Sequence, residues 1–212
     1  MKYIILDTET TNDIECPFVY DVGFAVIDES GKVYASYSYV VADIFCDSEL
    51  MKSAYFAEKI PSYWDDIAAN VRILKSFRSI ERIFRRVCKE WEVKAVVAHN
   101  ARFDYDALQT TKRYLTCSKY RYFFPYGMKF IDTLKLSRKV FGSDENYDTF
   151  CKSNNYVTKN NQNRYTAEVI YRFLTENQEF YEEHTGLADC MIEKDIFSHC
   201  MARECERNGY LW

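Results

Sequence analysis

The sequence predicts an α/β protein whose mixed sheet joins a three-strand antiparallel meander to parallel strands, with helices on both faces. Three observations support this fold class. The first 41 residues read as three strands, the middle alternates between helices and short apolar strands, and the last third is helical. The length of 212 residues suits one domain, so we expect a single domain over residues 1–212.

Strands dominate the N-terminal part of the sequence. Residues 3–6 are apolar and predict a buried strand that ends at Asp7. Residues 19–28 and 33–41 predict two further strands, joined by the turn sequence Glu-Ser-Gly-Lys. Connections this short indicate that the strands pair antiparallel.

Helical and extended patterns alternate in the rest of the chain. Residues 48–91 read as helical, and apolar side chains recur at helical spacing from Ile80 to Trp91, with Ser79 as the expected N-cap. Residues 154–164 are rich in Asn and predict a mobile loop. The other expected elements are a strand at 93–99, a helix at 101–114, a strand at 130–133, a short helix ending at residue 140, and helix from residue 166 onward.

The composition indicates a globular protein without a membrane segment. No apolar run approaches the roughly 18 residues of a membrane span, and no signal peptide is visible. The eight cysteines are scattered without a Cys-x-x-Cys pair, so we expect reduced thiols in a cytoplasmic protein. The net charge of −4 does not exclude a nucleic-acid partner, because a cation-binding site itself needs carboxylates.

Two carboxylates flank Thr8 at the end of the first strand. Residues i and i+2 of a strand point to the same side, so Asp7 and Glu9 can converge on one point. Two carboxylates so close together repel each other unless a cation binds between them. An Asp-x-Glu pair is a weak signal by itself, since solvated acids at a strand end also explain it.

Two later motifs lie where a helix is expected to begin. Residues 99–104 (HNARFD) follow an apolar strand, although Asn100 as N-cap and Asp104 near the positive end of a helix would explain them too. Residues 184–189 (HTGLAD) place His184 just before a helix that carries Asp189, on a segment expected to swing freely. By itself, the second histidine reads as an ordinary surface residue.

In this order, the three motifs closely resemble exonuclease motifs I, II and III of the DEDDh 3′–5′ exonuclease superfamily, which includes polymerase proofreading subunits, ribonuclease T and oligoribonuclease. The resemblance extends from residue 3 to residue 197, and residues 99–104 with residues 131–134 (IDTL) are its most specific part. It implies a ribonuclease H-like fold and two divalent cations, Mg²⁺ or Mn²⁺. The sequence departs from the usual pattern at Asn12, Asp21, Gly186 and Cys190.

The resemblance also implies roles for the motif residues. Asp7, Glu9 and Asp189 are expected to bind the first cation, while Asp7 bridges to the second and Asp104 supports the second through water. His184 is the expected general base, and the ordinary histidine pKa of about 6.5 suits that task. The residues expected to contact substrate are Thr8, Thr10, His99, Asn100 and Phe103.

A basic and aromatic segment is a further candidate for substrate binding. No acidic residue occurs between Asp106 and Asp132, and this interval carries Lys119 and Arg121 among many tyrosines and phenylalanines. Such a composition is typical of a single-strand binding surface. A segment that packs its aromatic side chains into the core and leaves its basic side chains in solvent explains this composition equally well. A second acid-free stretch occupies residues 152–167.

The implied activity is a 3′→5′ exonuclease that acts on single-stranded or frayed nucleic acid, DNA being favoured, and releases nucleoside 5′-monophosphates. The alternatives are an exoribonuclease of the ribonuclease T or oligoribonuclease type, a ribonuclease H-type endonuclease, and a non-catalytic nucleic-acid-binding module on the same fold. The expected partner is nucleic acid with a free 3′ end and not a membrane. A homodimer and a non-covalent polymerase partner both stay open.

Overall fold

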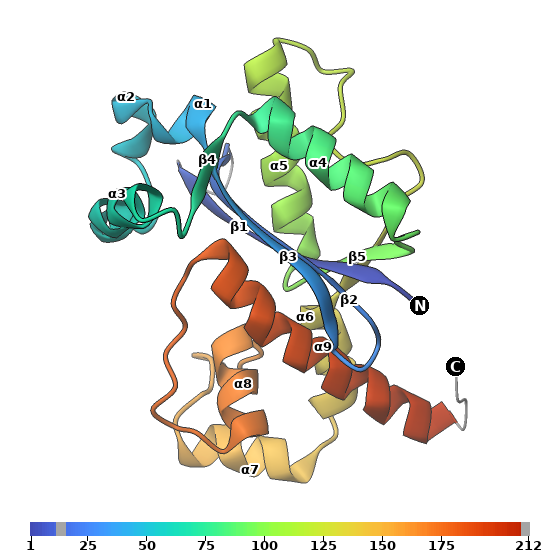
Figure 1. Ribbon diagram of the computed structural model, residues 1–212. Helices are drawn as coiled ribbons and strands as arrows, with labels where there is room; N and C mark the ends of the chain where they lie inside the picture. Colours follow the sequence, from blue (N-terminus) through green and yellow to red (C-terminus); the bar gives the residue numbers. More distant parts are fainter. Residues whose placement is uncertain (12–15, 209–212) are drawn as a thin grey trace.

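A six-stranded mixed sheet forms the centre of the part of the chain that the computed structural model describes, residues 1–11 and 16–208, with side chains described as far as residue 204. The strand order is β4-β3-β2-β1-β5-β6. β2 pairs antiparallel with β1 and β3, whereas β5 and β6 extend the sheet in parallel from β1 (Figure 1). The strands are β1 (Tyr3–Thr11), β2 (Phe18–Ile27), β3 (Val33–Val41), β4 (Ile73–Lys75), β5 (Ala95–Ala98) and β6 (Lys129–Asp132).

Helices cover both faces of the sheet, as the sequence predicts (Figure 1). On one face, α4 (Phe77–Glu90) and α5 (Ala101–Thr116) pack on the strands. On the other face, α9 (Gly186–Asn208) crosses β1 and β2. The remaining helical elements are α1 (Ala42–Phe45), α2 (Ser48–Met51), the 3₁₀ turn η1 (Ala57–Lys59), α3 (Ile60–Ala68), α6 (Thr133–Phe141), α7 (Glu145–Ser153) and α8 (Ala167–Thr175).

Burial on both faces explains the sequence of the central strands. Every residue of β2 is buried, as is every residue of β1 except Asp7. Strands covered on both sides carry continuous apolar runs instead of strict alternation. Among the helices of the described chain, none combines the length and the apolar character needed to cross a lipid bilayer.

Several elements differ from the sequence-based expectations. Ser76, not Ser79, caps α4, because its side chain accepts a hydrogen bond from the Ser79 backbone N–H at 3.3 Å. The edge strand β4 interrupts the region expected to be wholly helical, and it pairs in parallel with β3. The described region from residue 166 onward, expected to be helical throughout, contains α8 and α9, and residues 176–185 between them are not helical. Asn12 lies outside the described residues.

The segment between α7 and α8 is the predicted loop, and it is closed by its own hydrogen bonds. Val157 forms an isolated antiparallel bridge with Asn163. The Thr158 backbone N–H donates to the Gln162 carbonyl at 2.8 Å, and the Arg164 N–H donates to the Tyr156 carbonyl at 2.9 Å. The loop therefore has a defined hairpin-like shape.

The start of α9 lies directly against the backbone of β2. A Cβ atom added at Gly23 would lie 2.0 Å from the Gly186 carbonyl carbon, and a Cβ at Gly186 would lie 2.6 Å from the Gly23 nitrogen. The Gly186 N–H also donates to Asp21 Oδ2 at 3.1 Å, and the same oxygen accepts from Tyr63 at 2.6 Å and Arg72 at 3.1 Å. Two of the departures from the family pattern, Asp21 and Gly186, thus fix where α9 begins.

We expect Gly23→Ala to lower the free energy of unfolding by about 3 kcal/mol, because the added methyl group meets rigid backbone that has to move. Urea denaturation followed by circular dichroism measures the change. Ser36→Ala, at an exposed position of β3, is the matched control and should change stability by less than about 0.5 kcal/mol. A Gly23→Ala protein as stable as this control would show that the contact is not tight.

Candidate functional site

A cleft of about 1190 Å³ lies at the junction of β1, α5 and α9, and ten of the twelve residues singled out from the sequence line it. Segments distant in sequence meet there, because β1 and β5 are adjacent parallel strands and α9 crosses β1. The ten residues are Asp7, Thr8, Glu9, Thr10, His99, Asn100, Phe103, Asp104, His184 and Asp189.

Three carboxylates converge in the cleft. Asp7 and Glu9 leave the same side of β1, as their i, i+2 spacing requires. Asp189, in the first turn of α9, reaches the same point, and one ligand oxygen from each of the three lies within 4.8 Å of the others. The close contact between α9 and β2 makes this convergence geometrically feasible.

Asp104 approaches from the opposite face of the sheet. It occupies the first turn of α5, is 3% exposed, and accepts a hydrogen bond from the Thr8 hydroxyl at 2.9 Å. Asn100 precedes the helix with φ of 62°, in the left-handed region that Asn tolerates better than most residues. Its side chain makes no capping hydrogen bond, and the Phe103 N–H donates instead to the Asn100 carbonyl oxygen at 2.8 Å, so a backbone turn replaces the expected side-chain cap.

The burial of these acids raises their pKa values. Desolvation is the largest cause at each position, and it raises the pKa of Asp104 to about 7, of Asp189 to about 8 and of Glu9 to about 9. The pKa of Asp7 also lies well above its usual value, through desolvation and repulsion from neighbouring carboxylates. Charged oxygens crowded together away from water are stabilised by protons or by a bound cation.

The donor set fits a hard divalent cation. Asp7 Oδ2 and Asp189 Oδ1 are buried and have no hydrogen-bond partner among the described residues. Buried acceptors of this kind are rarely left unsatisfied in a protein, so these two oxygens are suited to bind a ligand. Carboxylate oxygens are the ligands that Mg²⁺ and Mn²⁺ prefer.

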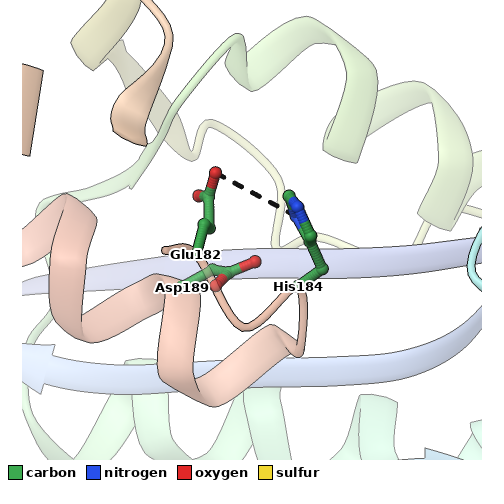
Figure 2. A group of neighbouring side chains, drawn as sticks. All are labelled: Glu182, His184 and Asp189. Carbon is green, nitrogen blue, oxygen red and sulfur yellow. Dashed lines mark ion pairs between the residues drawn. The ribbon is translucent and has the colours of Figure 1, made fainter. Parts of the chain in front are cut away.

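His184 faces the acids from the segment that leads into α9. Its ring stacks on Phe56 with centroids 4.3 Å apart and packs edge-to-face with Tyr181 with centroids 5.8 Å apart. These contacts hold the ring in place, so the segment is not free to swing as expected from the sequence. Figure 2 shows the Glu182 carboxylate facing the ring, with Oε2 4.0 Å from Nδ1, and Asp189 beside both. Desolvation, followed by the charge of Lys59, lowers the pKa of His184.

His99 has a structural role in the wall of the cleft. Its Nδ1 is 3.0 Å from the Thr133 hydroxyl and its Nε2 is 2.8 Å from the Tyr165 carbonyl oxygen. The ring therefore ties the end of β5 to α6 and to the loop before α8. Since Thr133 belongs to the IDTL segment, the two most specific parts of the family resemblance are in direct contact.

Sequence reasoning missed two further acids of the cleft, Glu182 and Glu193. Burial raises the pKa of Glu182 to about 7, and its carboxylate, His184 and Asp189 form a second group with ligand atoms within 4.8 Å. Glu193 is 3% exposed and follows Asp189 by one helical turn. The i, i+4 spacing from Asp189 is the signal that could have identified Glu193 in the sequence.

Lys119 and Arg121 are the two predicted residues that are absent from the described lining of the cleft. Both are exposed and follow the far end of α5. The helix carries Asp104 in its first turn and ends at Thr116, roughly 18 Å farther along the axis at about 1.5 Å per residue. A role for this surface in binding substrate stays a prediction.

Other members of the same basic segment are core residues. Lys112 is buried and pairs with Glu81, and Phe123 and Phe124 belong to the main hydrophobic cluster. These side chains fit the alternative explanation, in which the segment packs into the core. By contrast, the second acid-free stretch does reach the cleft, through Thr158, Asn163, Arg164, Tyr165, Thr166 and Ala167.

Solved structures with a similar fold match almost the whole chain. E. coli exonuclease I in complex with a dT13 oligonucleotide matches 99% of this chain, with a TM-score of 0.56 and 11% identity, and the zinc-bound form of its complex with single-stranded DNA matches 98%, with 0.54 and 11%. A moderately thermophilic exonuclease I from Methylocaldum szegediense matches 97%, with 0.53 and 14%.

These matches rest on structure alone. No protein-family model matches the sequence, and no curated protein matches it. The chain spans only 43%, 41% and 41% of the length of the three solved proteins. The strand order, the antiparallel meander and the parallel extension nevertheless correspond, so the chain has the ribonuclease H-like fold of exonuclease I, which confirms the predicted fold class.

Proposed function

We propose that this protein is a metal-dependent 3′→5′ exonuclease that hydrolyses phosphodiester bonds in single-stranded or frayed nucleic acid, with DNA favoured, and releases nucleoside 5′-monophosphates. The observation that carries the proposal is the convergence of Asp7, Glu9 and Asp189 at one cleft that also contains Asp104 and His184. Acids brought together from three elements are expensive to bury unless they bind cations, and Asp7 and Asp189 each have an oxygen without a partner among the described residues.

Two bound cations would stabilise the charge that develops on the attacking and leaving oxygens. Asp7, Glu9 and Asp189 would hold the first of them, and Asp7 with Asp104 the second. His184 is the general base in this proposal and takes the proton of the attacking water. Its lowered pKa keeps the imidazole neutral, and so able to accept a proton, at neutral pH.

Side chains around the acids suit a flexible nucleic-acid end. Tyr55 lines the cleft, is 75% exposed and offers a face on which a base can stack. Arg138 and Arg164 also line the cleft, are exposed, and bring positive charge beside its acids. The oligonucleotide complexes of E. coli exonuclease I support single-stranded DNA as the first substrate to test.

The direct test is digestion of 5′-labelled and 3′-labelled DNA and RNA oligonucleotides with Mg²⁺ or Mn²⁺. A 5′-labelled single strand should give a descending ladder, and Asp7→Asn and Asp189→Asn should each abolish hydrolysis because a cation ligand is lost. Asp195→Asn, on the same helix with a 45% exposed side chain, is the matched control and should stay active. Immediate release of a labelled mononucleotide from the 5′ end would contradict the polarity.

His184→Ala should lower kcat by about 10²–10⁴-fold, the usual contribution of a general base. Binding of Mn²⁺ and of oligonucleotide should be retained, which calorimetry and fluorescence anisotropy can measure. Glu183→Ala changes the exposed neighbouring residue and controls for disturbance of the segment. Loss of cation binding in His184→Ala would instead make the histidine a ligand.

The metal-free protein should lose stability as the pH rises. The raised carboxyl pKa values mean that the folded state favours the protonated acids. Protonation therefore stabilises the fold, and this contribution is complete below the pKa values of about 4 that the acids have in the unfolded chain. It is lost as the pH passes through about 7 for Asp104, about 8 for Asp189 and about 9 for Glu9. Thermal unfolding in EDTA should show a melting temperature that falls from pH 5 to pH 9, and Mn²⁺ should largely reverse the fall. A melting temperature that does not change with pH would contradict the predicted repulsion between the carboxylates of the cleft.

A further inference from the structure

Glu182, His184 and Asp189 form a second group of metal-binding side chains in the cleft (Figure 2). One ligand atom from each of the three lies within 4.8 Å of the other two. The imidazole distinguishes this group from that of Asp7, Glu9 and Asp189, which offers oxygen atoms only. The proposed mechanism gives Glu182 no role and does not use the three side chains together.

Contacts on both sides hold this second group in place. The Lys59 ammonium donates a hydrogen bond to the Glu183 carbonyl oxygen, which anchors the segment that leads into α9. Phe56 stacks on the imidazole of His184. Asp189 follows in the first turn of α9, whose start is fixed against β2. The three side chains are therefore held near one another before any cation binds.

Ligand atoms of the second group are free to bind a cation. Asp189 is 4% exposed, and its Oδ1 forms no hydrogen bond with a described residue. Neither ring nitrogen of His184 forms a hydrogen bond within the described chain, since the Glu182 carboxylate, 4.0 Å from Nδ1, is too far away for one. A buried carboxylate oxygen and a fixed imidazole nitrogen, both without such partners, fit a bound cation.

One imidazole and two carboxylates favour Zn²⁺ over Mg²⁺, because Mg²⁺ prefers oxygen ligands alone. Zn²⁺ binds His nitrogen and carboxylate oxygen at about 2.0–2.2 Å, and open sites contain three protein ligands and one water. Tetrahedral bonds of this length place neighbouring ligand atoms roughly 3.4 Å apart. The pair formed by Glu182 and His184, 4.0 Å apart, therefore has to close by about half an ångström, which rotation of the partly exposed Glu182 side chain supplies.

We propose that Glu182, His184 and Asp189 bind Zn²⁺ and that zinc at this site inhibits the enzyme. The bond to zinc uses the lone pair of one ring nitrogen of His184 and leaves the proton on the other, so the ring can no longer accept a proton from water. Asp189 belongs to both groups, so zinc also competes for a ligand of the first cation. Zinc binding does not depend on the proposed function, whereas the inhibition rests on it.

Calorimetric titration of the full chain with Zn²⁺ and, separately, with Mn²⁺, in the absence of nucleic acid, tests the site. Glu182→Gln and His184→Ala should each weaken Zn²⁺ binding by roughly tenfold or more, since even indirect partners of a bound metal contribute about 10–100-fold. Both variants should bind Mn²⁺ as the wild type does. Glu183→Gln removes a charge from the exposed residue between them and should match the wild type for both cations.

Wild-type Zn²⁺ affinity in either variant would overturn the inference, because zinc would then bind without that side chain. Equal losses for Zn²⁺ and Mn²⁺ would also overturn it, because Glu182 and His184 would then belong to the first metal centre.

Digestion of a labelled oligonucleotide in excess Mg²⁺ tests the inhibition. Zn²⁺ should stop hydrolysis by the wild type at the concentrations that fill the site in calorimetry, and Glu182→Gln should need roughly tenfold more zinc, in proportion to its loss of affinity. Hydrolysis that continues when the site is filled would overturn the inhibition. The proposed function fails separately, if the chain binds Zn²⁺ at this site but leaves every oligonucleotide intact with Mg²⁺ or Mn²⁺ alone.

Discussion

The contact between the backbone of β2 and the start of α9 is the constraint on which the site depends. Gly23 and Gly186 meet without side chains between them, and a Cβ at either position would collide with main-chain atoms. Asp21 holds the Gly186 N–H at 3.1 Å, which fixes the first turn of the helix. Helix axes normally lie about 10 Å from a sheet when side chains intervene. The glycine contact removes that spacing, so Asp189 and Glu193 reach the acids of β1.

The buried acids of this fold are of two kinds, and the presence or absence of an ion pair distinguishes them. Asp21 is fully buried, but its Oδ2 accepts hydrogen bonds from Tyr63, Arg72 and Gly186, and the arginine balances its charge. Asp21 Oδ1 has no hydrogen-bond partner among the described residues, and the same is true of Asp7 Oδ2, Asp189 Oδ1 and Glu193 Oε2. Unlike Asp21, however, these three acids form no ion pair within the described chain, and they lie beside other acids. The first arrangement stabilises the fold by itself, whereas the second costs free energy until a ligand arrives.

What the sequence could predict follows from the range of the interactions involved. Apolar strand runs, turn residues and helical spacing are local patterns, so the meander and α5 could be recognised, while the ten cleft residues were found through the resemblance of three motifs to a known family. β4 could not, because three residues carry no periodicity and the strand exists only through pairing with β3. Glu193 was missed because an acid one turn after Asp189 looks solvated until β1 and β5 cover it. Lys119 and Arg121 lie beyond the far end of α5 and outside the described lining of the cleft, so their role in binding substrate stays a prediction.

The charge distribution in the cleft follows from the same topology. The floor is built by β1 and α9, which supply the acids, while the wall is built by α6 and the hairpin-like loop before α8, which supply Arg138 and Arg164. His99, which follows β5, contacts Thr133 of α6 and the Tyr165 carbonyl oxygen of the loop, so both segments of the basic wall are tied to the sheet beside β1. Under the proposed function, the wall would attract a phosphate chain and the acids of the floor would repel it. Cations on the floor would reverse that repulsion, so metal binding and substrate binding should be coupled at this cleft.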